Sequence, residues 1–439
     1  MTLKETLGLS TAAIVLVSTA IYGDKVVSRQ ARTDRVTVIY WEKWTGDEAK
    51  EMRKVVDAFN RSQNRIFVQY LSISGVDTKT MLATAGGNPP DVAGIWLENL
   101  YEFSDANALT DLTKMAKANN IGRDYYIKNY WDPLNYQGGL WALPSTPASI
   151  ALHVRPDLLP SDVNTPATFP KTIEGLDALV DRVSKKKPNG DLEMAGFLPS
   201  NPGWWNWSWG VYFGGSLFDG QNLTLDSKEN VRAFDWVASY AKRFGSKEVQ
   251  SFQSGFGTFA SPQDPFMEGK VATELNGVWK ANYIRVYKKD LPWFAVPFPY
   301  PKDRPDLEGH SNLSQDVLTI PRGAKHPKEA FEFIAYVQTL EVMEGLCSGH
   351  GKNSPLAVVT EHFFKNHQNK YIRLFDQLAR SPKAFSPPAI GILPQVRDEL
   401  NVAFQEVSTE QKKPKDALHD AQVRMMALWD TYRSQVLNK

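Results

Sequence analysis

The N-terminal part of the chain alternates between short apolar runs and segments with helical spacing. Apolar runs at residues 36–41, 66–71 and 90–96 are separated by helical patterns at residues 45–61 and 78–85. The order strand, helix, strand, helix, strand is typical of a parallel sheet with helices on both faces. We therefore expect an α/β fold, with ligands beyond the carboxyl ends of the strands.

The helix expected at residues 45–61 has the clearest pattern. Its apolar residues recur at helical spacing and form one face: Ala49, Met52, Val56 and Phe59. The preceding residues, from Thr45 to Glu48, fit a capping box, in which each of these two side chains bonds a backbone N–H of the first turn. The sequence thus predicts both the helix and its start.

Two of the predicted strands end in the same kind of chemistry. Trp41-Glu42-Lys43-Trp44 closes the first strand, and Trp96-Leu97-Glu98-Asn99 closes the third. Each places an indole beside a carboxylate. Because parallel strands end at a common edge, these groups are candidates for ligand contacts.

A Pro-rich segment in the middle of the chain has the character of a crossing between two domains. Gly138-Gly139 permits a tight turn, and short apolar strands are expected at residues 140–143 and 149–154. Between them, prolines flank the polar pair Ser145-Thr146. A hinge suits this pattern, since a few residues at element ends can absorb a rotation. An ordinary hairpin inside one domain is the alternative.

Aromatic residues gather in a short segment of the second half. Residues 201–210 include Trp204, Trp205, Trp207 and Trp209. So many indoles cannot all face one core, so we expect some of them to stack on a ligand; packing within the core is the alternative. Further on, residues 266–279 predict a strand and a turn that present Asn276 and Trp279.

The remaining elements complete an α/β pattern. Residues 217–225 predict a hairpin, Ser227 caps a helix that continues to Phe244, and Pro327 begins another helix. A strand is expected at residues 317–320, and residues 361–439 are almost wholly helical.

Composition narrows the class of protein. A chain of 439 residues is too long to fold around a single hydrophobic core. Its 50 basic and 49 acidic side chains leave a net charge of +1, and it contains no long basic run, so we expect no nucleic-acid binding. The chain contains 13 Trp, and aromatic residues make up 12% of it, which favours an aromatic binding surface. The only cysteine, Cys347, is expected to be a small buried side chain.

The N-terminus predicts export. Lys4 precedes a run without charge from Leu7 to Tyr22, which fits an export signal or an uncleaved anchor. We therefore expect a signal peptide or membrane anchor at residues 1–23, a linker at 24–35, and the rest in the periplasm or outside the cell, with membrane contact through the N-terminal segment alone.

Common catalytic and metal patterns are not found in the sequence. The seven histidines are scattered, and no pair has the spacing of a zinc site. Residues 345–353 resemble a phosphate loop only distantly, because Leu346 occupies the place of its first glycine. We expect no cofactor. The carboxylates Glu42, Glu98 and Glu274 leave a glycosidase pair as an alternative.

Four motifs follow one another along the chain. Residues 86–92 read Gly-Gly-Asn-Pro-Pro-Asp-Val at the entry to the third expected strand, and residues 139–144 read Gly-Leu-Trp-Ala-Leu-Pro in the crossing segment. Residues 215–227 combine a glycine, a hairpin and a capped helix, and residues 266–279 read Phe-x-x-Gly-Lys-x-Ala-x-x-x-Asn-Gly-x-Trp. In this order the motifs resemble those of the extracellular solute-binding proteins that serve sugar importers of the ATP-binding-cassette type, the group that contains maltose-binding protein. The likeness spans about residues 36–360, and the correct order of the motifs makes it specific.

The resemblance implies a two-lobed periplasmic-binding-protein fold of type II, a Venus flytrap with three hinge crossings, near Pro144, Phe298 and Gly349. Lobe 1 would comprise residues 36–143 and 299–348, and lobe 2 residues 144–298 and 349–439. The implied ligand contacts are Trp41, Glu42, Lys43, Trp44, Glu98, Ser145, Thr146, Trp204, Trp205, Asn276, Trp279 and His310. Ala148 stands where maltose-binding protein has an acidic residue, which argues against maltose itself.

The resulting hypothesis is a monomeric, non-catalytic receptor that closes on a sugar or oligosaccharide and delivers it to the membrane permease of an ABC importer. A secreted carbohydrate-active enzyme is the alternative from another class. A surface adhesin or sensor that kept the fold is a third.

Overall fold

The computed structural model describes residues 34–258 and 260–437. The signal peptide or anchor expected at residues 1–23, and nearly all of the linker expected at 24–35, lie outside the described residues.

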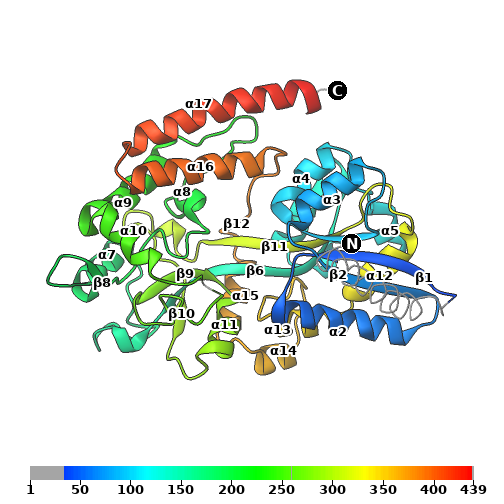
Figure 1. The fold of residues 1–439 in the computed structure, drawn as a ribbon, viewed down its shortest axis with the longest axis horizontal. Helices are drawn as coiled ribbons and strands as arrows, with labels where there is room; N and C mark the ends of the chain where they lie inside the picture. Colours follow the sequence, from blue (N-terminus) through cyan, green and yellow to red (C-terminus); the bar gives the residue numbers. More distant parts are fainter. Residues whose placement is uncertain (1–33, 259, 438–439) are drawn as a thin grey trace, which may run out of the picture.

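The first lobe is built on three parallel strands, as the sequence predicts. β1 (Val36–Glu42) pairs in parallel with both β2 (Ile66–Ser72) and β3 (Val92–Trp96). Figure 1 shows helices on both sides of these strands. Their bounds are α2 (Gly46–Ser62), α3 (Val76–Ala85), α4 (Leu97–Asp105), α12 (Pro327–Val337) and α13 (Leu340–Gly349).

Two long strands run from the first lobe into the second. β6 (Leu143–Val154) pairs antiparallel with β11 (Ser311–Thr319), and β11 continues the sheet by pairing with β3. Farther along, β6 pairs with β9 (Thr273–Gly277) and β10 (Phe294–Val296) of the second lobe. In Figure 1 the β6–β11 pair lies at the centre of the molecule and joins its two halves. The fold is therefore the predicted two-lobed type II arrangement.

The second lobe places helices around β9 and β10 (Figure 1). They are α7 (Ile173–Val183), α8 (Trp209–Tyr212), α9 (Lys228–Phe244), α10 (Ser246–Ser254) and α11 (Lys280–Tyr287), with a small hairpin of β7 (Lys185–Lys186) and β8 (Leu192–Met194). The helix cap predicted at Ser227 is confirmed, and the structure shows a second cap of the same kind at Thr172. The hydroxyl oxygens of Thr172 and Ser227 accept hydrogen bonds from the backbone N–H groups of Gly175 and Asn230, respectively.

The C-terminal part is mainly helical, as expected. It contains α14 (Glu361–Asn366), α15 (Ile372–Arg380), α16 (Leu393–Ser408) and α17 (Pro414–Tyr432), and the short strand β12 (Ala384–Phe385). The last two helices pack on the second lobe and also reach α4 of the first (Figure 1). There the hydroxyl of Tyr432 donates a hydrogen bond of 2.5 Å to Asp105.

Short one-turn elements connect these parts. They are α5 (Thr113–Ala118), α6 (Lys128–Trp131), the strand pair β4 (Asn135–Tyr136) and β5 (Gly139–Leu140), and 3-10 turns at Arg123–Tyr125, Asp132–Leu134, Pro156–Leu158, Asn206–Ser208 and Pro305–Leu307.

The strand expected at residues 149–154 begins already at Leu143, so Ser145-Thr146 lies inside β6 and the prediction of a break there is wrong. The strand expected at residues 140–143 is also wrong, because Leu140 ends β5 and only Leu143 belongs to β6. Pro144 and Pro147 lack an N–H group, yet they fall in the half of β6 that has β11 as its one strand neighbour. The pairing also shifts register there, between Gln315 and Val317. No second ladder needs the missing donors, so the prolines are tolerated.

The predicted capping box at the start of α2 is also wrong. Thr45 is extended and precedes the helix, but its side chain makes no capping hydrogen bond. Glu48, the other member of the expected box, lies with its carboxylate 4.0 Å from the ammonium of Lys352. A long-range contact has replaced the local one.

The other described features agree with the sequence in part. β11 begins several residues before the strand expected at 317–320. Cys347 is buried, as expected. Among residues 34–258 and 260–437, no helix has the length and apolar character needed to cross a membrane.

Candidate ligand-binding site

The end of β1 fixes a buried carboxylate beneath the surface of the first lobe. Glu42 is fully buried and accepts hydrogen bonds from the hydroxyl of Tyr40 (2.6 Å) and the backbone N–H of Lys43 (2.8 Å). Gly94 on β3 leaves room for it, since a Cβ atom there would lie 1.8 Å from Oε2 of Glu42. Burial raises the pKa of the Glu42 carboxyl, and the Lys43 ammonium opposes this effect. Glu42 therefore positions Lys43.

Lys43 leads to a charged chain that crosses the hinge strands. Its Nζ lies 3.0 Å from Oε1 of Glu42 and 3.0 Å from Oδ1 of Asp316 on β11. The other oxygen of Asp316, Oδ2, lies 2.6 Å from Nζ of Lys352. Burial acts to raise the pKa of the Asp316 carboxyl, but the ammonium groups of Lys352 and Lys43 outweigh it and hold that pKa well below its usual range.

A polar ring surrounds this chain at the crossing. The hydroxyl of Thr146 on β6 donates to Oδ2 of Asp316 at 3.2 Å, and Nδ1 of His350 lies 3.4 Å from the same hydroxyl. Nε2 of His350 lies 2.9 Å from the backbone oxygen of Glu48, to which it donates. Burial and the nearby Lys352 lower the pKa of His350 to about 3, so its ring is neutral at pH 7.

Indoles of the first lobe line this charged chain. The ring of Trp44 stands edge to face against His350, with centroids 4.4 Å apart. Nζ of Lys43 lies 5.1 Å from the centre of the Trp44 ring and 5.3 Å from that of Trp96. Such distances are typical of cation–π contacts. Trp96 remains 46% exposed, so part of its face is accessible.

Indoles of the second lobe approach the same charges. Nζ of Lys352 lies 5.6 Å from the ring centre of Trp44 and 5.8 Å from that of Trp279, which precedes α11. The ring of Trp279 in turn lies 5.8 Å from Trp204 and 6.3 Å from Trp205. Trp204 is 42% exposed. Indoles from both lobes thus converge where the crossing strands meet.

We call this group the hinge cluster. Its members come from the ends of β1 and β3, from β6 and β11, from the loop after α13, and from the two Trp-bearing segments of the second lobe. They are Lys43, Trp44, Trp96, Thr146, Trp204, Trp205, Trp279, Asp316, His350 and Lys352.

A buried carboxylate anchors the second-lobe indoles. Oε2 of Glu274 on β9 accepts a hydrogen bond of 2.8 Å from Nδ2 of Asn201, which begins the loop carrying Trp204 and Trp205. Its Oε1 accepts from Nδ2 of Asn276, at the turn before Trp279. One carboxylate therefore links both Trp-bearing segments.

Glu274 belongs to a buried ionic triad. Nζ of Lys280 lies 2.9 Å from Oε1 of Glu274 and 2.8 Å from Oδ1 of Asp264, and all three side chains are 0–1% exposed. Burial raises the pKa of the Asp264 carboxyl, and the Glu274 carboxylate raises it further. One ammonium thus faces two carboxylates, which favours a protonated Asp264.

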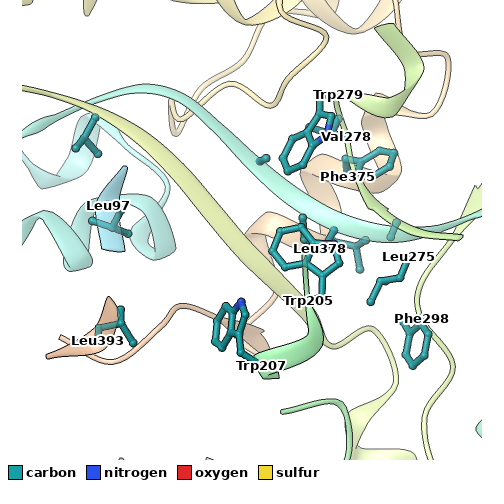
Figure 2. Close-up of a cluster of buried hydrophobic side chains, with 14 of the residues drawn as sticks. Leu97, Trp205, Trp207, Leu275, Val278, Trp279, Phe298, Phe375, Leu378 and Leu393 are labelled. Atoms are coloured by element: carbon teal, nitrogen blue, oxygen red, sulfur yellow. The ribbon is translucent and has the colours of Figure 1, made fainter. Parts of the chain in front are cut away.

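A second polar group lies between α4 and α16. Nη1 of Arg397 lies 3.7 Å from Oε1 of Glu98, and the guanidinium carbon lies 5.2 Å from the ring centre of Trp207. Oε2 of Glu98 and Nε of Arg397 are buried, and among the described residues neither has a hydrogen-bond partner. In the view of Figure 2, Trp205 lies between Trp279 and Trp207. The segment that carries Trp205 and Trp207 therefore reaches from the hinge cluster to the pair Glu98–Arg397.

The structure brings together six of the twelve expected contact residues: Lys43, Trp44, Thr146, Trp204, Trp205 and Trp279. Trp41 is half-buried on β1 next to them. Glu98 lies in the second polar group instead.

The other expected contacts face elsewhere. Glu42 and Asn276 are fully buried and bonded to neighbours. Ser145 is buried, and its backbone oxygen faces Sγ of Cys347 at 3.9 Å. His310 packs edge to face on Tyr212, with centroids 6.0 Å apart, and burial lowers its pKa to about 4. A role in binding stays a prediction for all twelve.

Sequence reasoning missed Asp316, His350 and Lys352. Asp316 falls just before the strand expected at residues 317–320, so the expected elements do not place it at the crossing. His350 and Lys352 lie in the segment at residues 345–353, next to the crossing expected near Gly349. That position is the signal that could have identified them, because polar side chains from both lobes meet at a crossing.

Two cavities lie away from the hinge cluster. One, of about 270 Å³, lies between β8 and α10 and includes Lys187, Glu193, Glu248 and Lys270 in its lining. The other, of about 180 Å³, includes Lys171 and Glu308, which pair with each other at 3.2 Å. The lining of neither contains a buried, unpartnered polar side chain, so we assign the site from the hinge cluster. Within the described residues, no group of three His, Cys, Asp or Glu side chains could hold a metal.

The hinge cluster suits a ligand with both apolar faces and hydroxyl groups. Indole faces can pack on an apolar ring face, and the polar atoms at their edges can bond hydroxyl groups. Buried Nε1 atoms of Trp205 and Trp279 have no hydrogen-bond partner among the described residues. Buried donors normally have partners, so these two indole nitrogens are exceptions in the aromatic part of the cluster.

A family comparison matches most of the chain. Residues 54–361 match the model of a bacterial extracellular solute-binding protein. The multiple sugar-binding protein of Streptococcus mutans is 22% identical over 374 residues, which cover 78% of this chain and 83% of that protein. The sn-glycerol-3-phosphate-binding periplasmic protein of Pectobacterium atrosepticum is 21% identical, with 97% of each chain covered.

Solved structures share the fold. The structure of CpMnBP1 with mannobiose bound superposes with a TM-score of 0.79 at 24% identity, covering 89% of this chain and 99% of that one. At this level of identity the similarity supports the two-lobed fold.

Proposed function

The chain belongs to the bacterial extracellular solute-binding proteins, and from this premise we propose that it captures a sugar or oligosaccharide between its lobes and delivers it to the permease of an ABC importer. The protein would act as a monomer outside the cytoplasm, in the periplasm or at the cell surface, and the N-terminal segment would provide export or a membrane tether.

One observation carries the proposal. Indoles of the first lobe, Trp44 and Trp96, and of the second, Trp204 and Trp279, converge on the charged residues at the crossing strands. A ligand held there contacts both lobes at once. Such a ligand stabilises the closed arrangement, because only that arrangement offers both sets of contacts.

The proposed contacts are the stacking residues Trp44, Trp96, Trp204 and Trp279. Glu98, in the second polar group, would accept a hydrogen bond from a ligand hydroxyl. The expected lobes are residues 36–143 with 299–348, and 144–298 with 349–439. We propose one change to these bounds, with residues 299–310 belonging to the second lobe. Tyr300 still bridges to Thr172 of that lobe, and β11 begins only at Ser311.

The relatives' names support a sugar ligand but include one phosphate ester. Multiple sugars and mannobiose are named for two of them, and sn-glycerol 3-phosphate for the third. A sugar fits the four indoles better, because an indole face needs an apolar ring face to pack on.

The burial of two candidate acids speaks against a glycosidase. Glu42 and Glu274 are fully buried and hold neighbouring protein groups, so neither is free to donate a proton to a ligand. Incubation with oligosaccharides tests this directly: a receptor releases no reducing ends, whereas a hydrolase would release them steadily.

A thermal-shift screen over mono- and oligosaccharides, with sn-glycerol 3-phosphate included, tests the proposed function. A true ligand raises the melting temperature, and the stabilisation grows with the logarithm of the ratio of ligand concentration to Kd, because the ligand binds only the native state. We expect at least one neutral oligosaccharide to raise it by several degrees. If sn-glycerol 3-phosphate were the one compound that raised it, the ligand class would be wrong.

A further inference from the structure

We propose that Asp316 makes the hinge cluster selective for uncharged ligands, because its carboxylate forms ion pairs with both Lys43 and Lys352. The inference rests on the proposed function, since it concerns the ligand of the same site.

The geometry divides one carboxylate between two cations. Oδ1 of Asp316 lies 3.0 Å from Nζ of Lys43, and Oδ2 lies 2.6 Å from Nζ of Lys352. All three side chains are only 7–8% exposed. Charges at such depth interact strongly, and an ion pair there is costly to break.

Each ammonium also faces a second carboxylate. Lys43 lies 3.0 Å from Oε1 of Glu42, and Lys352 lies 4.0 Å from Oε1 of Glu48. Two ammonium groups therefore face three carboxylates. An anionic ligand finds no unpaired positive charge here and must lie close to Asp316, which carries the same sign of charge.

The neutralisation persists over a wide pH range. The two ammonium groups hold the pKa of Asp316 well below its usual range, and the surrounding carboxylates raise the pKa of both lysines despite their burial. All three groups thus stay ionised between about pH 4 and pH 10, the interval between the ordinary pKa values of Asp and Lys.

The neutral ligand can still use these residues. The faces of Trp96 and Trp204 remain partly exposed beside them, and hydroxyl groups can bond to ions that are already paired. An uncharged sugar ring can bind in this way, by stacking and by hydrogen bonds from its hydroxyl groups. A carboxylate or phosphate group on the ligand gains no additional binding energy here.

Matched ligand pairs test the inference on the unaltered protein by calorimetry. Each pair is a neutral disaccharide and the same disaccharide with one terminal hydroxymethyl group oxidised to carboxylate; the disaccharides are mannobiose, cellobiose and maltose. Glycerol and sn-glycerol 3-phosphate form a further pair. We expect binding of at least one neutral disaccharide, with its anionic counterpart at least tenfold weaker.

The outcomes separate the two proposals. Binding of an anionic member as tightly as its neutral counterpart overturns the selectivity but leaves the receptor function intact. Binding of no member at all counts against the proposed sugar receptor, and the selectivity falls with it.

Substitution of the carboxylate assigns the effect to Asp316. In Asp316→Asn, Lys352 retains only the more distant Glu48 carboxylate, so we expect the preference for the neutral member to fall at least tenfold. The double variant Asp316→Asn/Lys352→Met removes the released cation and should restore the preference. An unchanged preference in a folded Asp316→Asn variant, judged by circular dichroism, would show that Asp316 does not set it.

Discussion

The ammonium group of Lys352 lies over the indole of Trp279, with Nζ 5.8 Å from the ring centre. Lys352 lies just after α13, at the third expected crossing, and Trp279 leads into α11 of the second lobe. The same ammonium group lies 2.6 Å from Oδ2 of Asp316 on β11, so Lys352 connects the charged chain to the aromatic residues.

Replacing Trp279 by alanine should weaken binding of the sugar found in the thermal-shift screen. Loss of one stacked ring costs about 1 kcal/mol or more of binding free energy, which is a factor of five or more in Kd. Isothermal titration calorimetry measures the change. Tyr287→Ala is the matched control, because Tyr287 is an exposed aromatic residue at the far end of α11, and its affinity should equal that of the unaltered protein. Equal Kd values for both variants would remove Trp279 from the site.

Replacing Lys280 by methionine should destabilise the second lobe. The change leaves Asp264 and Glu274 buried and facing each other without a cation, and removing one partner of a buried ionic group costs about 3–5 kcal/mol. Urea unfolding measures the loss. Lys288→Met is the control, since Lys288 pairs with Glu268 at 3.1 Å with both side chains exposed, and a surface pair contributes about 0–1 kcal/mol. Similar losses in the two variants would contradict the triad's role.

Replacing Asp264 by asparagine should increase the relative stability at high pH. The raised pKa of Asp264 means that the folded state retains a proton which the unfolded state releases above about pH 4. Its contribution is therefore fully present below the unfolded pKa and is lost as pH rises through the folded pKa.

Asparagine keeps the Oδ1 acceptor and stays neutral at every pH. The free energy of unfolding of Asp264→Asn, minus that of the unaltered protein, should rise by on the order of 1 kcal/mol between pH 4.5 and pH 8. Urea unfolding at the two pH values gives this difference. A constant difference would mean that Asp264 is ionised throughout.

Replacing Gly94 by alanine should disturb the support of Lys43. The new Cβ would lie 1.8 Å from Oε2 of the buried Glu42, so backbone or side chain must move. Overpacking of this kind costs about 1–3 kcal/mol. Gly345→Ala is the control, because a Cβ atom there has no neighbour within 4 Å, and alanine is the better helix former. Thermal unfolding measures both changes: the melting temperature should fall clearly in Gly94→Ala and should stay the same or rise in Gly345→Ala.

The fold could be predicted from the sequence to a large extent because its signals are local. Strand and helix patterns at residues 36–96 predicted the parallel strands, and the cap at Ser227 predicted the start of a helix. The continuous strand β6 could not be found in this way. A proline interrupts a strand when the strand has a neighbour on each side that needs its backbone N–H groups. The half of β6 with Pro144 and Pro147 has β11 as its one strand neighbour, which the sequence does not reveal.

The candidate site could be predicted only in its aromatic part. Indoles such as Trp44 and Trp279 stand out in a sequence because they are rare and follow strand ends. Asp316 and Lys352 do not stand out, because single charged residues occur throughout the chain. Their importance arises from a 2.6 Å contact between distant segments, which no local pattern reveals.

The central claim is that indoles of both lobes hold one sugar at the hinge cluster. A tryptophan fluorescence titration with the neutral disaccharide that best stabilises the protein tests it most directly, with Trp96→Phe and Trp204→Phe variants as reporters of each lobe. The account predicts a saturable change with a stoichiometry of about one, in line with a single site between the lobes, and a smaller change in each of the two variants. A saturable signal of full size in both variants would contradict it.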